Sequence, residues 1–297
     1  MEGRDYQSAL DAYSEAVGVA LEARPTERRD RRERPWVVLS DPHLPGLRTD
    51  LLGQIIAARG GRRANCFVAG DVLNFDRFSR WPQTDIHEPS LPTLLRERDA
   101  FLATLREAFC RVVVLGGNHD ARLWKKAASL GPDYHWLTQQ FFVTMFAKVH
   151  GVEFIWKPFT KRSGKVLHTC FWEQIGDCVI GHVERSGTTP LRGARLANEF
   201  FQKWRKELPL RSWPYRVLLQ AHTHRRGYWF DPVSHVHCYE TGALCDTPDY
   251  AVLDHRSDPI QHGYYWLVQK DGATDLNRSQ LMVFEAERRT TDDPKRI

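Results

Sequence analysis

Residues 36–43 read Trp-Val-Val-Leu-Ser-Asp-Pro-His, an apolar run typical of a buried strand that ends in a carboxylate and an imidazole. Four more apolar runs along the chain also end in polar side chains. The runs 66–69, 111–115, 178–180 and 217–219 lead into Gly70-Asp71, Gly116-Gly117-Asn118-His119-Asp120, Gly181-His182 and Ala221-His222-Thr223-His224. Because α/β folds place their sites where strands end, this repetition predicts an α/β fold with a site at the strand ends.

Stretches of helical periodicity alternate with these strands. Helices are expected at 49–59 and 92–109, and the stretch 121–149 is also expected to be helical. After about residue 150 a helix at 190–207 interrupts short strands expected at 152–156, 166–171, 177–180, 215–220, 227–230, 235–240, 263–268 and 281–284. This order predicts a two-sheet β-sandwich flanked by helices, because each helix must bury its apolar face on a sheet.

The main domain is expected at 35–287, between two terminal segments. Residues 5–23 carry apolar side chains at three- and four-residue steps, which predicts an amphipathic helix. That helix would pack on the main domain, or bind a protein partner or a second copy. The Arg-rich stretch that completes residues 1–34 is expected to be an exposed linker, with a nucleic-acid-binding arm as the alternative. Residues 288–297 form a polar tail.

Composition narrows the class of protein. The chain has 297 residues, 42% hydrophobic residues and a net charge of +5, which permits an anionic substrate without requiring one. No run of 18 apolar residues occurs and the N-terminus has no apolar segment, so we expect a cytoplasmic protein with no membrane partner. The six cysteines show no Cys-x-x-Cys spacing, and we expect reduced thiols, mostly buried, rather than disulfides or a zinc site.

The polar residues at the strand ends have the chemistry of metal ligands. Asp41 and His43 stand two residues apart, as do His222 and His224, so the side chains of each pair can point to the same side. Together with three further residues, these pairs give seven candidate ligands: Asp41, His43, Asp71, Asn118, His182, His222 and His224. These are too many for one tetrahedral ion and suit two divalent ions. Mixed carboxylate and imidazole ligands favour Mn²⁺, Fe, Zn²⁺ or Ni²⁺ over Mg²⁺, and Mn²⁺ is our first expectation.

In this order, the five motifs resemble the pattern of the calcineurin-like metallophosphoesterase superfamily, and the resemblance covers about residues 36–231. It implies a four-layer α/β/β/α fold around a dinuclear metal site. It also implies that Asp71 bridges the two ions. Asp41, His43 and His224 would complete one ion, and Asn118, His182 and His222 the other.

The resemblance further implies phosphoester hydrolysis by a metal-activated water, with His119 as general acid. Asp120 follows His119 directly and is expected to hold its ring in one tautomer and keep it protonated. Arg122 is expected either to reach a substrate phosphate or to cap the helix that begins there. Arg185, shortly after His182, has the same two possible roles.

Within the superfamily, the run Gly70-Asp71-Val72-Leu73-Asn74-Phe75 lacks the Asp-Arg-Gly of the protein phosphatases and favours the nuclease and phosphodiesterase branch. It is similar to a subgroup encoded in bacteriophage and prophage genomes, which points to a bacterial or phage-infected cell. Basic residues interleaved with aromatic ones at 156–172 and 190–207 favour DNA or RNA as the substrate. The alternatives are a small-molecule or nucleotide phosphoesterase, and a non-catalytic metal-bound scaffold that docks a partner through residues 1–34.

Overall fold

The computed structural model describes residues 35–79, 89–143, 151–156, 158–163, 166–184, 192–208, 210, 214–246 and 260–284. All of them belong to one compact unit, Arg34–Ile297. The predicted helix at 5–23, the Arg-rich segment and the tail at 288–297 lie outside the described residues.

A mixed six-stranded sheet contains the first three polar strand ends. Its strand order is β14-β11-β1-β2-β3-β4. The strands are β1 (Trp36–Leu39), β2 (Asn65–Ala69), β3 (Val112–Leu115), β4 (Glu153–Ile155), β11 (Gly263–Leu267) and β14 (Gln280–Val283). Strands β1 to β4 run parallel, so their carboxyl ends meet at one edge, while β11 and β14 are antiparallel additions.

A second six-stranded sheet contains the remaining two polar motifs, in the order β5-β6-β7-β8-β10-β9. Its strands are β5 (Phe159–Ser163), β6 (Val166–Ile175), β7 (Cys178–Val183), β8 (Val217–Gln220), β9 (Arg226–Asp231) and β10 (Val236–Thr241). Strands β7, β8 and β10 are parallel. A small hairpin, β12 (Gln269–Lys270) with β13 (Ala273–Thr274), forms a third sheet.

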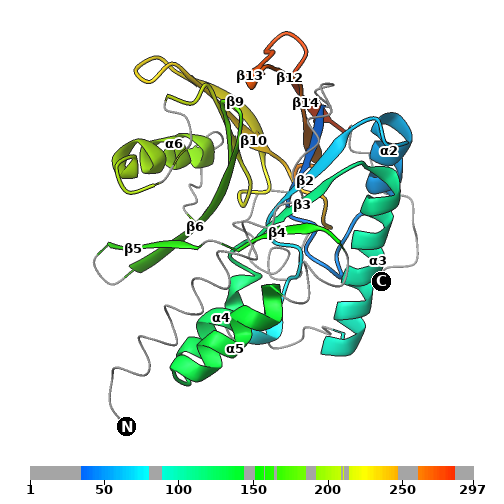
Figure 1. The fold of residues 1–297 in the computed structure, drawn as a ribbon, viewed down its shortest axis with the longest axis vertical. Helices are drawn as coiled ribbons and strands as arrows, with labels where there is room; N and C mark the ends of the chain where they lie inside the picture. Colours follow the sequence, from blue (N-terminus) through cyan, green and yellow to red (C-terminus); the bar gives the residue numbers. More distant parts are fainter. Residues whose placement is uncertain are drawn as a thin grey trace, which may run out of the picture. The chain divides into compact units, whose positions relative to one another are not determined.

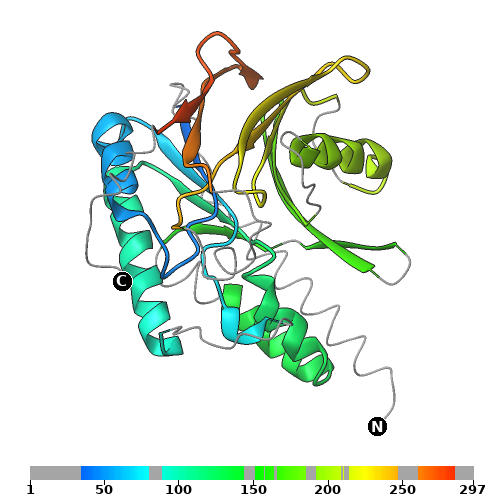
Figure 2. The ribbon, with the colours of Figure 1, turned by 180° about the vertical axis from the view of Figure 1, so that it is seen from behind.

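Five α-helices and one 3₁₀ helix lie within the described residues. They are α2 (Thr49–Arg59), η1 (Asp76–Phe78), α3 (Leu91–Ala108), α4 (Ala121–Ala128), α5 (Pro132–Val143) and α6 (Arg192–Trp204). Helices α2 and α3 lie beside the first sheet and α6 beside the second, as two opposite views show (Figure 1; Figure 2). The mixed α/β class expected from the sequence is therefore confirmed.

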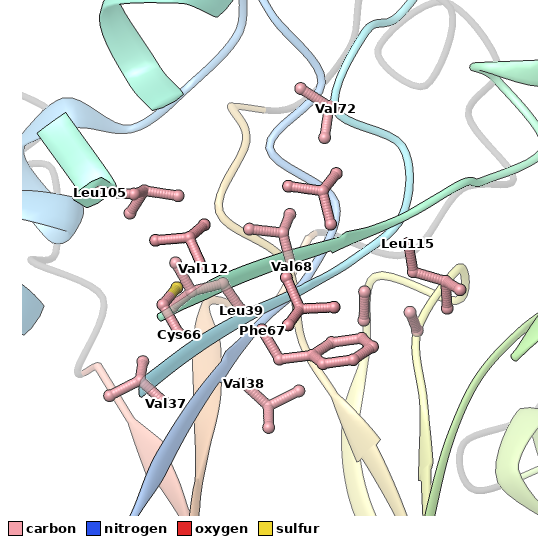
Figure 3. Close-up of a cluster of buried hydrophobic side chains, with 14 of the residues drawn as sticks. Val37, Val38, Leu39, Cys66, Phe67, Val68, Val72, Leu105, Val112 and Leu115 are labelled. Atoms are coloured by element: carbon pink, nitrogen blue, oxygen red, sulfur yellow. The ribbon is translucent and has the colours of Figure 1, made fainter. Parts of the chain in front are cut away.

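The two sheets share one hydrophobic cluster, to which β1, β2 and β3 contribute consecutive residues. Figure 3 shows its part at β1, β2 and β3, where Val38, Phe67 and Val68 are completely buried. On β7, Cys178 and Ile180 belong to this cluster, while Val179 and Val183 belong to a second cluster with α6. Because successive side chains of a strand point to opposite faces, β7 can pack on the first sheet and on α6 at once.

The stretch 121–149, expected to be helical, is helical over most of its described part but is not one continuous helix. The chain forms α4 and α5 instead, separated by a turn that includes Gly131 at a φ of +132° and followed by Pro132. A positive φ interrupts helical geometry, and proline is favoured at the first position of a new helix. Residues 144–149 lie outside the described residues.

The bounds of several strands differ from the predicted bounds by a few residues. Strand β6 extends to Ile175, four residues beyond the prediction, because it pairs with β7 as far as Cys178. Strand β5 was not expected, and β10 begins at Val236, with His235 in the preceding turn. Among the described residues, none of the helices combines the length and apolar character needed to cross a membrane.

Candidate metal centre

All seven predicted ligands lie in one region, where the ends of the two sheets meet. Asp41 and His43 follow β1, Asp71 follows β2 and Asn118 follows β3. His182 lies within β7, and the pair His222 and His224 follows β8. Nothing local in the sequence brings these segments together, because they lie far apart in the chain and come from two different sheets that pack on a shared core.

The backbone at this region is strained. Among the described residues, nine that are not glycine have a positive φ, and five of them are Asp41, His43, Asp71, His222 and His224. A non-glycine residue in this conformation costs on the order of 1–3 kcal/mol and persists only where the surrounding structure imposes it. More than half of the non-glycine residues with a positive φ in the described part of the chain are thus predicted ligands.

Asp41, His43 and His224 form the first half of the centre. Nε2 of His43 lies 2.9 Å from Nε2 of His224, and Oδ1 of Asp41 lies 3.6 Å and 3.3 Å from these two atoms. Burial would raise the pKa of the Asp41 carboxyl, but His224 and His43 hold it well below its usual value. This half therefore combines an ionised oxygen with two ring nitrogens.

Asp71, Asn118, His182 and His222 form the second half. Nε2 of His182 lies 2.8 Å from Oδ1 of Asn118 and 3.2 Å from Oδ2 of Asp71. One ligand atom each from Asp71, His182 and His222 lie within 4.8 Å of one another. Nδ1 of His182 is 2.8 Å from the carbonyl oxygen of Ala69, so we assign the ring hydrogen to Nδ1. The lone pair of a neutral His182 then points from Nε2 toward two oxygen acceptors.

In the absence of an added cation, the carboxylate of Asp71 favours a proton on His182. Burial lowers the pKa of His182, but Asp71 outweighs it and raises that pKa to about 10. For His222, burial and the charge of His182 lower the pKa to about 4. A cation beside Asp71 would replace the proton of His182 as the positive charge and leave the Nε2 lone pair available as a ligand.

The hydrogen bonding of two carboxylate oxygens indicates whether these residues could bind metal ions. Oδ1 of Asp41 and Oδ2 of Asp71 are buried and accept no hydrogen bond. Their partner oxygens are satisfied, because Oδ2 of Asp41 accepts the N–H of His222 at 3.0 Å and Oδ1 of Asp71 accepts that of His119 at 2.8 Å. A buried carboxylate oxygen left without a donor is costly, and both atoms face ring nitrogens. The donor set therefore fits cations.

Oδ2 of Asp71 lies between the two halves. It is 3.7 Å from Nε2 of His43 in the first half and 3.2 Å from Nε2 of His182 in the second. A single carboxylate oxygen therefore faces a ring nitrogen of each half.

His119 is held by partners other than the predicted one. Its Nδ1 lies 2.7 Å from Oδ1 of Asn74, and its Nε2 lies 3.1 Å from Nη2 of Arg122. Because a guanidinium only donates, we assign the hydrogen to Nδ1 and the lone pair to Nε2. Burial lowers the pKa of His119 well below its usual value, which favours the neutral ring.

The prediction that Asp120 orients and protonates His119 is wrong. The carboxylate of Asp120 accepts backbone N–H groups of Val72 (3.3 Å), Leu73 (2.9 Å) and Gly117 (3.0 Å) and does not contact the ring. Burial and the charge of Asp71 raise the pKa of Asp120 to about 7. Asp120 instead ties the loop after β2 to the loop after β3, which carry Asp71 and Asn118.

Arg122 lies in the site and does not act as a helix cap. It donates from Nη1 to the carbonyl oxygen of Asn74 at 3.0 Å and to the carboxylate of Asp76. Its side chain is 17% exposed, so it borders solvent next to His119. Arg185, Lys157 and Lys165 lie outside the described residues, whereas Lys161 and Arg162 belong to β5.

The aromatic residues expected to stack on bases are mostly in the core. Trp156, Phe171, Phe200 and Phe201 are buried in the two hydrophobic clusters. Phe159, Trp172 and Trp204 are partly buried and pack against the second cluster. These seven rings therefore contribute mainly to packing, as aromatic residues in such runs usually do.

Three residues of the site were given no role from the sequence: Asn74, Asp76 and Cys245. Oδ1 of Asn74 accepts from Nδ1 of His119 and lies 3.2 Å from Nδ1 of His43, while its Nδ2 donates to Asp76. Cys245 contributes a thiol near His43 and His224. The only sequence signal for Asn74 and Asp76 is that they follow Gly70-Asp71 within six residues, and Cys245 has none.

Comparison with known proteins adds no family assignment. None of the protein-family models matches this chain, and no curated protein matches its sequence.

Proposed function

We propose that this protein is a dinuclear-metal-dependent phosphoester hydrolase with the four-layer fold of the calcineurin-like metallophosphoesterase superfamily. The observation that carries the proposal is the pair of buried, unpartnered oxygens, Oδ1 of Asp41 and Oδ2 of Asp71, facing the imidazole nitrogens. The five motifs in order and the two sheets with helices beside them agree with it. A protein that bound metal only for stability would not need strained ligand turns at the open ends of two sheets.

The residues divide into two ligand sets with one shared member. Asp41, His43 and His224 would hold one ion, and Asn118, His182 and His222 the other. Asp71 would serve both, because its Oδ2 faces one histidine of each set. Oxygen and imidazole donors of this kind suit Mn²⁺, Fe or Zn²⁺.

Bound ions in such a site supply an activated water and neutralise the phosphoryl oxygens. The chain's own residues orient the reaction. Asn74 fixes His119 through Nδ1, so Nε2 is the ring atom that would first take up a proton and then pass it to a leaving oxygen. Arg122 donates toward that same Nε2 and borders solvent, and we assign its guanidinium to binding a substrate phosphate.

For the substrate we propose nucleic acid first, with a small-molecule or nucleotide phosphoester as the alternative. The support is the charge of α6 and the residues after it, where Arg192, Lys203, Arg205 and Lys206 are exposed. Arg195 is also exposed but pairs with Glu199 at 3.0 Å, which weakens the positive field of the helix. The aromatic residues add little, because most are buried.

The first experiment measures Mn²⁺-dependent hydrolysis of single-stranded DNA, duplex DNA and bis-p-nitrophenyl phosphate by the full chain. Asp71→Asn is the inactive reference. Asp271→Asn is its matched control, because Asp271 is an exposed turn residue with the same φ of 52° as Asp71. Asparagine tolerates this conformation, so both variants keep the backbone and only one alters the site.

Each outcome has a distinct meaning. DNA cleavage that is lost in Asp71→Asn and kept in Asp271→Asn supports a nuclease. Cleavage of the small diester alone supports the hydrolase and directs the search to nucleotides and other small phosphoesters. No turnover at full metal occupancy would contradict the proposal and favour the non-catalytic scaffold.

A further inference from the structure

Cys245 differs from the other buried cysteines of the chain. Cys66, Cys170, Cys178 and Cys238 all belong to one of the two hydrophobic clusters, and Cys110 is exposed. Cys245 is buried and belongs to neither cluster. Its burial therefore does not come from apolar packing of the kind that explains the other four.

Backbone hydrogen bonds on both sides hold Cys245 against the loop that follows β1. The N–H of Leu244 donates to the carbonyl oxygen of Ser40 at 3.0 Å, and the N–H of Asp246 donates to that of Gly46 at 2.7 Å. Cys245 itself forms an antiparallel bridge with Leu47. The thiol is thus fixed opposite the turn that carries Asp41 and His43.

The groups that surround this thiol are metal-binding groups. Sγ of Cys245 and one ring nitrogen each of His43 and His224 lie within 4.8 Å of one another. Oδ1 of Asp41, buried and without a hydrogen-bond partner, lies 3.6 Å and 3.3 Å from the Nε2 atoms of these two histidines. Cys245 would add one sulfur to the oxygen and two nitrogens of this set, and the shared Asp71 would bring the ion to five donors, a number that zinc sites can reach.

We propose that Cys245 is a thiolate ligand of the ion held by Asp41, His43 and His224, an inference that rests on the proposed metal centre. Binding forms a metal–sulfur bond and releases the thiol proton to solvent, since only the thiolate coordinates. This assignment replaces the expectation that all six cysteines are plain thiols.

A thiolate in one half makes the two positions chemically different. Sulfur and imidazole donors favour Zn²⁺, Fe²⁺ or Co²⁺, whereas the set of Asp71, Asn118, His182 and His222 offers only oxygen and nitrogen. We therefore expect the Cys245 position to prefer Zn²⁺ over Mn²⁺, and the other position to accept Mn²⁺. The centre would then be a mixed-metal pair.

Co²⁺ binding to the metal-stripped full chain tests this directly. We expect a near-ultraviolet sulfur-to-cobalt charge-transfer band together with the visible bands of bound Co²⁺. In Cys245→Ser the charge-transfer band should disappear while visible bands remain, and affinity at this position should fall by at least about tenfold, the lower end of what altered ligand surroundings cost. Cys110→Ser, which changes an exposed cysteine, is the matched control and should keep the band.

X-ray absorption spectroscopy of the Zn²⁺-loaded wild-type protein tests the thiolate ligand without any substitution. A sulfur neighbour at about 2.3 Å from zinc supports the proposal. Bound metal with only nitrogen and oxygen neighbours, or a charge-transfer band that survives in Cys245→Ser, overturns the thiolate ligand and leaves the metal centre standing. A wild-type chain that binds neither Co²⁺ nor Zn²⁺ overturns both.

Discussion

At the scale of single residues, Asn74 has the widest influence on the site. Its amide oxygen faces Nδ1 of both His43 and His119, at 3.2 Å and 2.7 Å. Asn74 therefore favours a hydrogen on Nδ1 of both rings. The Nε2 lone pair of His43 is then available to a cation, and Nε2 of His119 faces Arg122. Groups that orient ligands in this way are as important to metal affinity as many ligands themselves.

Replacing Asn74 by alanine should weaken metal binding by about 10- to 100-fold, because His43 loses the acceptor that fixes its ring. Titration of the stripped protein with Mn²⁺ or Co²⁺ measures this. Asn277→Ala, at an exposed turn position, is the control and should bind like the wild type. Unchanged affinity in Asn74→Ala would show that the ring is held by other contacts.

Replacing His119 by alanine should leave metal content intact and slow turnover by roughly 10²–10⁴-fold, the usual contribution of a positioned acid or base. The reason is that His119 lies outside the two proposed ligand sets, with its Nε2 at 3.1 Å from Nη2 of Arg122. Metal analysis and turnover on a diester with a poor leaving group check both parts. His235→Ala, exposed in the turn before β10, should retain full activity. Full activity of His119→Ala would remove His119 from the mechanism.

At the scale of elements, the loops after β2 and β3 must approach each other closely to bring Asp71 beside Asn118. Gly117 makes this possible. A Cβ at this position would lie 2.1 Å from Oδ1 and 2.3 Å from the backbone nitrogen of Asp71, distances that no side-chain rotation can relieve. Asp120 completes the junction by accepting N–H groups from both loops.

Gly117→Ala should therefore lower the free energy of unfolding by about 1–3 kcal/mol or more and abolish metal binding, since the backbone of Asp71 must move. Denaturant unfolding and metal titration measure the two effects. Gly53→Ala is the control, because Gly53 lies in α2 with no atom within 4 Å of the added methyl group. That change should stabilise the fold by roughly 0.5–1 kcal/mol. Normal metal binding in Gly117→Ala would contradict the close approach.

At the scale of the whole molecule, the centre draws its residues from both sheets, so ions should stabilise the complete fold. Asp71 follows a strand of the first sheet, whereas His182 and His222 belong to the second. An ion bound between them would connect the two layers. A ligand that binds only the folded state raises the free energy of unfolding. The increase grows with the ratio of the ligand concentration to its dissociation constant.

Metal at a hundredfold excess over its dissociation constant should raise the free energy of unfolding by about 2.7 kcal/mol. The melting temperature should therefore rise by several degrees on metal addition and return on chelation. Asp71→Asn should not respond to metal, while Asp271→Asn should respond like the wild type. A melting temperature that changes neither on addition of metal nor on addition of chelator would argue against a centre shared by the two sheets.

Much of this protein could be predicted from local sequence. Apolar runs followed by Asp, Asn and His predicted the strands and the seven ligand candidates, because strand burial and turn chemistry act over a few residues. Helix α3 at Leu91–Ala108 lies within one residue of its predicted bounds for the same reason. The break between α4 and α5 was also present in the sequence, as Gly131-Pro132, and was missed.

Tertiary structure alone decided the contacts between distant segments. Asp120 binds loop amides rather than the adjacent His119, since three N–H donors from two loops converge on its carboxylate. Cys245 lies beside His43, about two hundred residues earlier in the chain, because backbone pairing joins their loops. Local patterns specify which residue types end each strand, but only the packing of the two sheets determines which of those ends meet.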